Sequence, residues 1–94
     1  MLTDRDLLKV RKKLVEIGGT AYFYFKDNPN VLVVGRFIRA VDREGRTVPW
    51  SRAFGGKLIV DVIMTYGIDK IKVVLNDGRS IEFSSLRDFI KWVR

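Results

Sequence analysis

Two tyrosines in a predicted hairpin are the residues best placed for binding chemistry. Residues 20–25 read Thr-Ala-Tyr-Phe-Tyr-Phe, residues 31–34 are all aliphatic, and residues 27–30 (Asp-Asn-Pro-Asn) provide turn chemistry between the two arms. Successive strand side chains point to opposite faces, so if the alternate apolar residues of the first arm fill a core, Tyr22 and Tyr24 point away from it. Tyrosine rings on a non-core face can stack on unpaired bases.

Catalysis has few candidate residues. The sequence contains no cysteine and no histidine, which excludes disulfides and removes the commonest general base and metal ligand. Asp61 lies in an apolar segment while Asp42 and Glu44 lie in a predicted turn, so no carboxylate pair has an evident shared site. Gly55-Gly56-Lys57 lacks the first glycine and the Ser/Thr of a phosphate-binding loop. We therefore expect a protein that is not an enzyme and uses no metal or cofactor.

The charge of the chain indicates an anionic partner. Lys and Arg number 18 against 11 Asp and Glu, which gives a net charge of +7 and a pI near 10.1. Self-repulsion makes such a charge costly in a small domain, and nucleic acid is the first candidate for compensating it. The alternative is that the Lys and Arg residues are ordinary solvated surface residues of a thermophile protein. The chain has no glutamine and is 31% charged, which is typical of such proteins.

The length and hydropathy of the chain favour one domain spanning residues 1–94. A hydrophobic content of 47% suffices for a single core. No run approaches the roughly 18 apolar residues of a membrane span, and the start, Met-Leu-Thr-Asp-Arg-Asp, lacks the order of a signal peptide. We expect a soluble, cytoplasmic protein with no membrane partner.

The first half of the chain predicts a helix followed by strands. The helix spans residues 3–17, with Thr3 and Asp6 as a capping box and Gly18-Gly19 as its end. The second arm of the hairpin is expected to continue to residue 40 or 41, with Gly35 as a bulge or close backbone approach. Residues 47–50 form a short return strand at an edge of the sheet, because their proline cannot donate to a ladder.

The second half predicts a loop, a helix, a hairpin and a final helix. Residues 57–66 fit either periodicity, and we choose a helix because Gly67 reads as its C′ glycine. Strands 68–75 and 79–83 flank the turn Asn76-Asp77-Gly78, and Ser84 or Ser85 caps the last helix. The predicted fold is α+β, in the order α-β-β-β-α-β-β-α. It has an antiparallel sheet of four or five strands and three helices mainly on one face.

The alternation along the strands assigns aromatic, aliphatic and basic side chains to the uncovered sheet face. This predicted face comprises Tyr22, Tyr24, Leu32, Val34, Arg36, Lys70, Lys72, Val74, Ser80 and Glu82. Such a mixture suits single-stranded nucleic acid, since bases stack on aromatic rings while Lys and Arg follow the phosphates. The candidate binding residues are Tyr22, Tyr24, Lys26, Arg36, Arg39, Arg43, Arg46, Trp50, Arg52, Phe54, Lys70 and Lys72.

Each part of this interpretation has an alternative. The tyrosines can simply cover cross-strand neighbours. Leu32 and Val34 can instead indicate a second subunit, and Trp50 with Phe54 can be a core anchor.

The chain resembles the small thermophilic archaeal single-stranded DNA-binding proteins of the ThermoDBP type. The residues that carry the resemblance are Tyr22-Phe23-Tyr24-Phe25, the arginines from Arg36 to Arg52, and the closing segment of residues 83–92. The resemblance implies a small antiparallel sheet with flanking helices and a cleft that mixes aromatic, aliphatic and basic side chains.

Our first hypothesis is non-catalytic, largely sequence-independent binding of single-stranded nucleic acid, DNA before RNA. The alternative is a structural or regulatory protein, for example a viral one, whose sheet face is a homodimer interface. A duplex-DNA binder is the third hypothesis.

Overall fold

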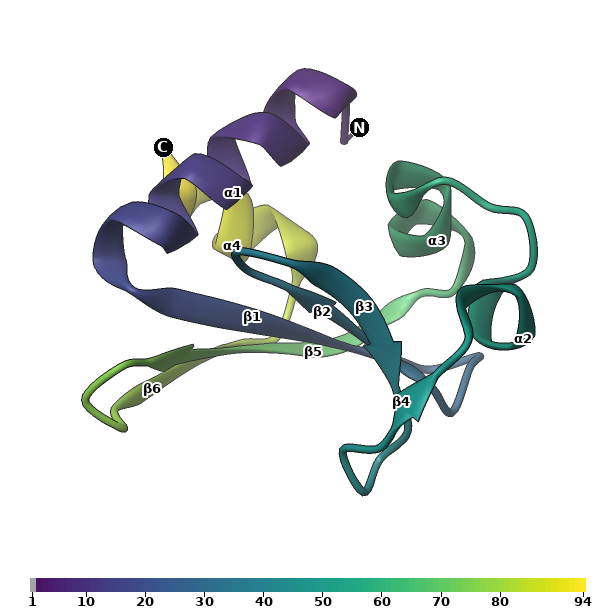
Figure 1. The fold of residues 1–94 in the computed structure, drawn as a ribbon. Helices are drawn as coiled ribbons and strands as arrows, with labels where there is room; N and C mark the ends of the chain where they lie inside the picture. The colour runs from purple at the N-terminus through teal and green to yellow at the C-terminus, as the bar shows by residue number, and fades with distance from the viewer. Residues whose placement is uncertain (1) are drawn as a thin grey trace.

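The computed structural model describes residues 2–94 and has an α+β architecture of two layers, one helical and one a sheet (Figure 1). Within these residues the sheet has six strands in the spatial order β4-β3-β2-β1-β5-β6, and all neighbours are antiparallel. The strands are β1 (Gly19–Phe25), β2 (Val31–Val34), β3 (Ile38–Val41), β4 (Thr47–Val48), β5 (Ile68–Leu75) and β6 (Ser80–Phe83). The helices are α1 (Asp4–Ile17), α2 (Trp50–Phe54), α3 (Ile59–Thr65) and α4 (Leu86–Val93).

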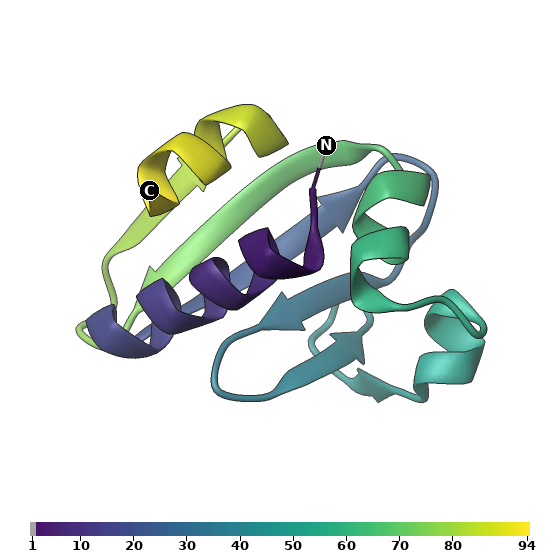
Figure 2. The ribbon, with the colours of Figure 1, turned by 90° about the horizontal axis from the view of Figure 1, so that it is seen from above.

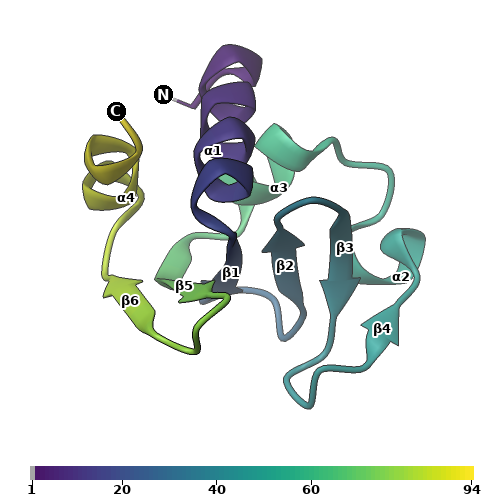
Figure 3. The same ribbon diagram turned by 60° about the vertical axis from the view of Figure 1, so that its left-hand side comes forward.

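The helices leave one face of the sheet uncovered. Seen from above, α1 crosses the middle of the sheet while α4 and α3 lie on either side of it (Figure 2). Figure 3 shows that α1, α3 and α4 all lie on the same side of the sheet, with α2 beside the β3–β4 edge. The predicted one-sided arrangement of helices is therefore confirmed. None of the helices in the described part of the chain is long and apolar enough to cross a membrane.

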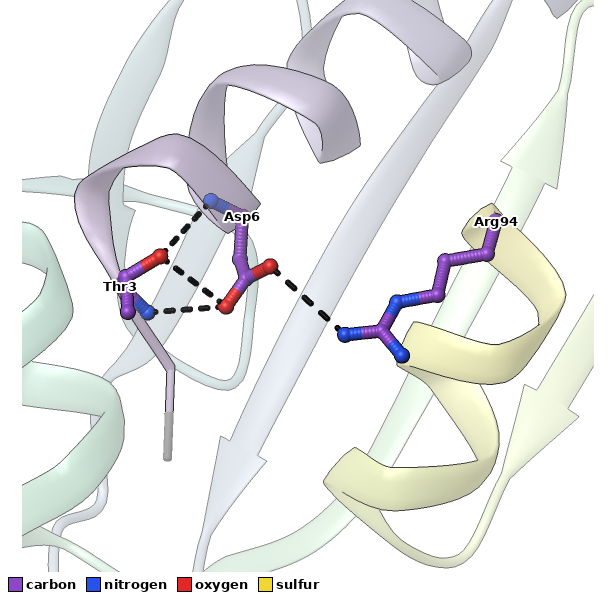
Figure 4. Close-up of polar contacts among 3 residues, drawn as sticks. All are labelled: Thr3, Asp6 and Arg94. Atoms are coloured by element: carbon purple, nitrogen blue, oxygen red, sulfur yellow. Dashed lines mark hydrogen bonds and ion pairs between the residues drawn. The ribbon is translucent and has the colours of Figure 1, made fainter.

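Helix α1 begins and ends as its sequence predicts. Thr3 is the N-cap: its hydroxyl accepts from the backbone N–H of Asp6, and the Asp6 carboxylate accepts from the backbone N–H of Thr3 at 3.1 Å (Figure 4). This backbone hydrogen bond, together with the Thr3 hydroxyl, lowers the pKa of Asp6, and Arg94 and Lys9 add to the effect. Arg94 Nη2 lies 3.9 Å from Asp6 Oδ1, which ties the last residue to the start of α1. Gly18 ends the helix with φ +65°.

The stretch from residue 31 to residue 41 is two strands, so the prediction of one interrupted strand is wrong. Val34 pairs with Ile38, and residues 35–37 form the turn between β2 and β3. A Cβ at Gly35 would lie 3.2 Å from Thr20 Oγ1 on β1, so the glycine leaves room for the Thr20 side chain where the chain reverses. This extra reversal explains why the described sheet has one strand more than the predicted maximum of five.

The segment between the two halves of the sheet contains an additional short helix. Most of the segment predicted as a loop after residue 50 belongs to α2. This helix follows edge strand β4 directly, with Pro49 as its N-cap. The predicted helix is present as α3, and Gly67 follows it with φ +47° as expected of a C′ glycine. The final hairpin and the Ser85 cap of α4 are also confirmed.

The main core lies between the helices and the sheet. Phe23 on β1 is 1% exposed and makes an edge-to-face contact with Phe89 of α4, with ring centroids 5.5 Å apart. Phe25 makes a similar contact with Phe54 of α2 at 6.0 Å. The aromatic residues of β1 that point toward the helices therefore fix the positions of α4 and α2. Their neighbours on the same strand necessarily point to the other face.

Candidate nucleic-acid interface

The helix-free face of the sheet carries both tyrosines, and we call it the tyrosine face. Direct cross-strand partners share a face, and the register places one row of five partners across five strands. This row runs Arg39, Val33, Tyr22, Lys72 and Glu82. A second pairing on the face joins Tyr24 to Lys70. The predicted placement of the two tyrosines and two lysines on one face is therefore confirmed.

A small second core lies on this face. Val31, Val33 and Val41 are at most 4% exposed, and the half-buried rings of Tyr22 and Tyr24 pack against them. The valines lie on strands that no helix covers on this side (Figure 3), so the neighbouring side chains, the tyrosines among them, provide their burial. The packing fixes the tyrosines in position, as binding groups require.

Leu32 and Val34 do not lie on the tyrosine face, and their predicted assignment is wrong. Leu32 pairs with Phe23 and Val34 pairs with Ala21, so both belong to the main core and are 0% exposed. All four residues of β2 are buried, so its sequence offers no polar residue from which to read the alternation. The β2 residues that do lie on the tyrosine face are Val31 and Val33, which were not assigned to it from the sequence.

Lys70 interacts with two neighbours on the tyrosine face. Its Nζ lies over the Tyr24 ring, 5.0 Å from the ring centroid, and 3.8 Å from Glu82 Oε1 on β6. The side chains of Lys70 and Glu82 are 46% and 58% exposed. Solvent screens an ion pair of this exposure strongly, so Lys70 is free to exchange partners at low cost. Lys72, which is half-buried, lies beside Tyr22 in the next pairing along the strands.

Arginines extend the positive charge on the β3 side of the tyrosines. Arg39 is exposed and belongs to the cross-strand row. Arg43 and Arg46 belong to the β3–β4 turn, which projects on the helix-free side of the sheet (Figures 1 and 3). Asp42 Oδ1 accepts from the backbone N–H groups of Glu44 and Arg46 at 3.0 and 2.9 Å, which holds the turn in one conformation. Three of the predicted arginines thus lie on or beside the tyrosine face.

Arg36 and Arg52, which were also predicted as binding residues, lie away from this face. The carbonyl of Arg36 accepts from Arg11 Nη2 of α1 at 3.2 Å, which places the β2–β3 turn beside the helical layer. Arg52 is exposed on α2. Lys26 follows β1, and its backbone N–H donates to the carbonyl of Gly67 at the end of the sheet.

Trp50 and Phe54 are anchors of the main core, so the alternative interpretation applies to this pair. Phe54 is 1% exposed, and its ring contacts that of Trp50 with centroids 5.0 Å apart. Trp50 packs partly buried against the main core and donates from Nε1 to the carbonyl of Lys57 at 2.9 Å. Both residues hold α2 and the segment before α3 together on the helical side. Neither is available for stacking on the tyrosine face.

The exposed apolar residues of the molecule lie outside the sheet. Within residues 2–94 the large hydrophobic side chains that are exposed are Leu8, Val15, Ile17, Phe37, Leu58 and Met64. They belong to α1, to the β2–β3 turn, and to α3 and the residue before it. An apolar cavity of about 470 Å³ opens on the same side, lined partly by Leu7, Trp50 and Leu58. Exposed apolar side chains are therefore concentrated on the helical layer, while the tyrosine face combines aromatic rings with Lys70, Lys72 and Arg39.

Comparison of the chain with protein-family models, with curated proteins and with solved structures gave no match. The resemblance to the ThermoDBP type stays a prediction. Across residues 2–94, no three carboxylate side chains come together in a group that could hold a metal ion.

Proposed function

We propose that this protein binds single-stranded nucleic acid without strong sequence preference, through the tyrosine face. The observation that carries the proposal is the direct cross-strand pairing of Tyr22 with Lys72 and of Tyr24 with Lys70 on the face that no helix covers. Each pair combines a ring for base stacking with an ammonium group for a phosphate. This is the combination that sequence-tolerant recognition of unpaired bases requires.

The geometry of the strands suggests a path for the ligand. Tyr22 and Tyr24 lie two residues apart on β1, so their positions are separated by roughly 6.6 Å along the strand. Lys72 and Lys70 have the same spacing on β5. A single strand lying along β1 and β5 would place two successive bases on the tyrosines and the phosphates between them beside the lysines. Arg39 and the arginines of the β3–β4 turn would attract the backbone on the other side.

The expected energies are sufficient for useful affinity. Stacking of one base on an aromatic side chain contributes about 1–3 kcal/mol. The phosphate contacts add a term that depends strongly on salt. The tyrosines are already held by the valine cluster, so little conformational entropy is lost when a base stacks on them.

The homodimer alternative has less support than the sequence suggested. It depended on Leu32, Val34 and Val74 as apolar surface of the sheet, and the first two are core residues. Val74 is half-buried. A dimer would bring the basic sheet faces of two copies together, which electrostatic repulsion opposes. A duplex-DNA binder would use the same cations and leave the tyrosine pairs without a role.

The experiment is an anisotropy titration of labelled oligo-dT against Tyr22→Leu and Tyr24→Leu. Leucine keeps an apolar side chain on the valine cluster and removes the ring, so we expect folded variants that bind more weakly by about 1–3 kcal/mol each. Phe37→Leu is the matched control, because Phe37 is 72% exposed on the helical side, and it should bind like the wild type. Equal affinity for blunt duplex and single strand, with no effect of the tyrosine variants, would falsify the proposal.

A further inference from the structure

Lys70 occupies the position that a stacked base would need. Its Nζ lies 5.0 Å from the centroid of the Tyr24 ring, and the same ring packs against the valine cluster. Cation–π contacts of this kind contribute only modestly where the cation is exposed. A base can reach the Tyr24 ring over the tyrosine face only after Lys70 has moved away.

Glu82 is the second group that holds Lys70 there. Its carboxylate lies 3.8 Å from Lys70 Nζ, and it is the direct cross-strand partner of Lys72. One carboxylate thus stands beside both lysines of the proposed phosphate path. No other acidic residue belongs to the cross-strand row of the described tyrosine face.

We propose that Glu82 is an internal competitor of the ligand phosphates, and that binding transfers Lys70 from Glu82 and the Tyr24 ring to a phosphate. This inference rests on the proposed function and adds a residue that sets its affinity. When Lys70 leaves, the Glu82 carboxylate loses its partner and stands next to an incoming phosphate of like charge. Both effects oppose binding, so Glu82 lowers the affinity and keeps the complex reversible.

The first experiment compares Glu82→Gln with a charge-matched control in the oligo-dT titration. Glu16→Gln removes the same charge from an exposed position of α1 on the helical side. The ion pair is exposed, so we expect Glu82→Gln to tighten binding by about two- to fivefold. Glu16→Gln should tighten it far less, because at moderate salt a distant charge is screened. In a Lys70→Ala background the effect of Glu82→Gln should shrink, since the two residues act on each other.

The second experiment observes Lys70 directly by NMR. In the free protein the ε-methylene protons of Lys70 should be shifted upfield by the ring current of Tyr24. On addition of oligo-dT they should move to the positions of an exposed lysine. Resonances that stay shifted in the bound state would show that Lys70 does not leave the ring, and the transfer would be wrong.

The two proposals fail in different ways. If the wild type binds oligo-dT and the tyrosine variants weaken it, but Glu82→Gln equals Glu16→Gln, only the role of Glu82 is refuted. If the wild type does not bind oligo-dT at low salt, the proposed function is refuted and the role of Glu82 with it.

Discussion

Single residues decide where the helices begin and which groups are held at their ends. The capping box of Thr3 and Asp6 was readable from the sequence because its two partners are three residues apart and need no tertiary context. The contact between Asp6 and Arg94 joins opposite ends of the chain, and no local pattern predicts it. The same carboxylate therefore has one partner that the sequence reveals and one that only the fold reveals (Figure 4).

Replacing Asp6 with asparagine should destabilise the protein at neutral pH and lose its effect in acid. The folded state lowers the pKa of Asp6 from its ordinary value of 3.8, chiefly through the backbone hydrogen bond with Thr3. A carboxyl group whose pKa is lowered by folding stabilises the folded state at pH values above its pKa in the unfolded chain. This stabilisation is lost as the pH falls through its pKa in the folded state. The difference in Tm between the wild type and Asp6→Asn should thus be full at pH 7 and narrow below about pH 4.

Asp4→Asn is the control for this measurement, because it removes the same charge from the same helical turn. A pH-independent difference for Asp6→Asn would show that the carboxylate does not act through its charge. Thr3→Ala, which removes the hydroxyl of the cap, should lower the free energy of unfolding by about 0.5–2 kcal/mol.

At the scale of elements, the sequence predicted strands better than their register. The β5–β6 hairpin was predictable because Asp77-Gly78 specifies its turn and because Lys72 and Glu82 mark the polar face. The β1–β2 hairpin was ambiguous, since β2 is apolar at every position and a shift of one residue exchanges its two faces. Because of that ambiguity, Leu32 was assigned to the tyrosine face in place of Val33, and the valine cluster was not predicted.

Hydrogen exchange should distinguish the β2–β3 hairpin from a continuous strand. β2 lies between β1 and β3, so its backbone amides should exchange slowly at all four positions. The amides of Arg36 and Phe37 lie in the turn and should exchange much faster. Amide exchange followed by NMR measures this residue by residue. Slow exchange that continues unbroken through residues 36 and 37 would contradict the hairpin.

At the scale of the whole molecule, the two layers have different surfaces. The exposed apolar residues belong to the helical side and the two tyrosines to the sheet side, while lysines and arginines lie on both. Net charge and composition could not predict this division, because they do not say where a residue lies. Trp50 and Phe54 illustrate the point: their residue types suit stacking, but the position of α2 makes them part of the core.

The division predicts that the location of a lysine matters more than its charge. The double variant Lys70→Ala/Lys72→Ala should weaken oligo-dT binding. The plot of log K against log salt should become less steep, by about 0.7 for each phosphate that is no longer neutralised. Lys9→Ala/Lys12→Ala removes the same charge from the exposed side of α1 and should leave the slope close to that of the wild type. Titrations at several salt concentrations give both slopes. An equal weakening in the two variants would mean that binding depends on net charge alone.

Strand β2 belongs to two cores at once, since Leu32 and Val34 pack toward the helices and Val31 and Val33 pack under the tyrosines. Most strands of a one-sided sheet can exchange every second residue freely during evolution. β2 has no such position, because a polar replacement at any of its four residues would be buried on one side or the other. Its sequence should therefore drift only among aliphatic residues, and the outer side of α1 should diverge long before it does.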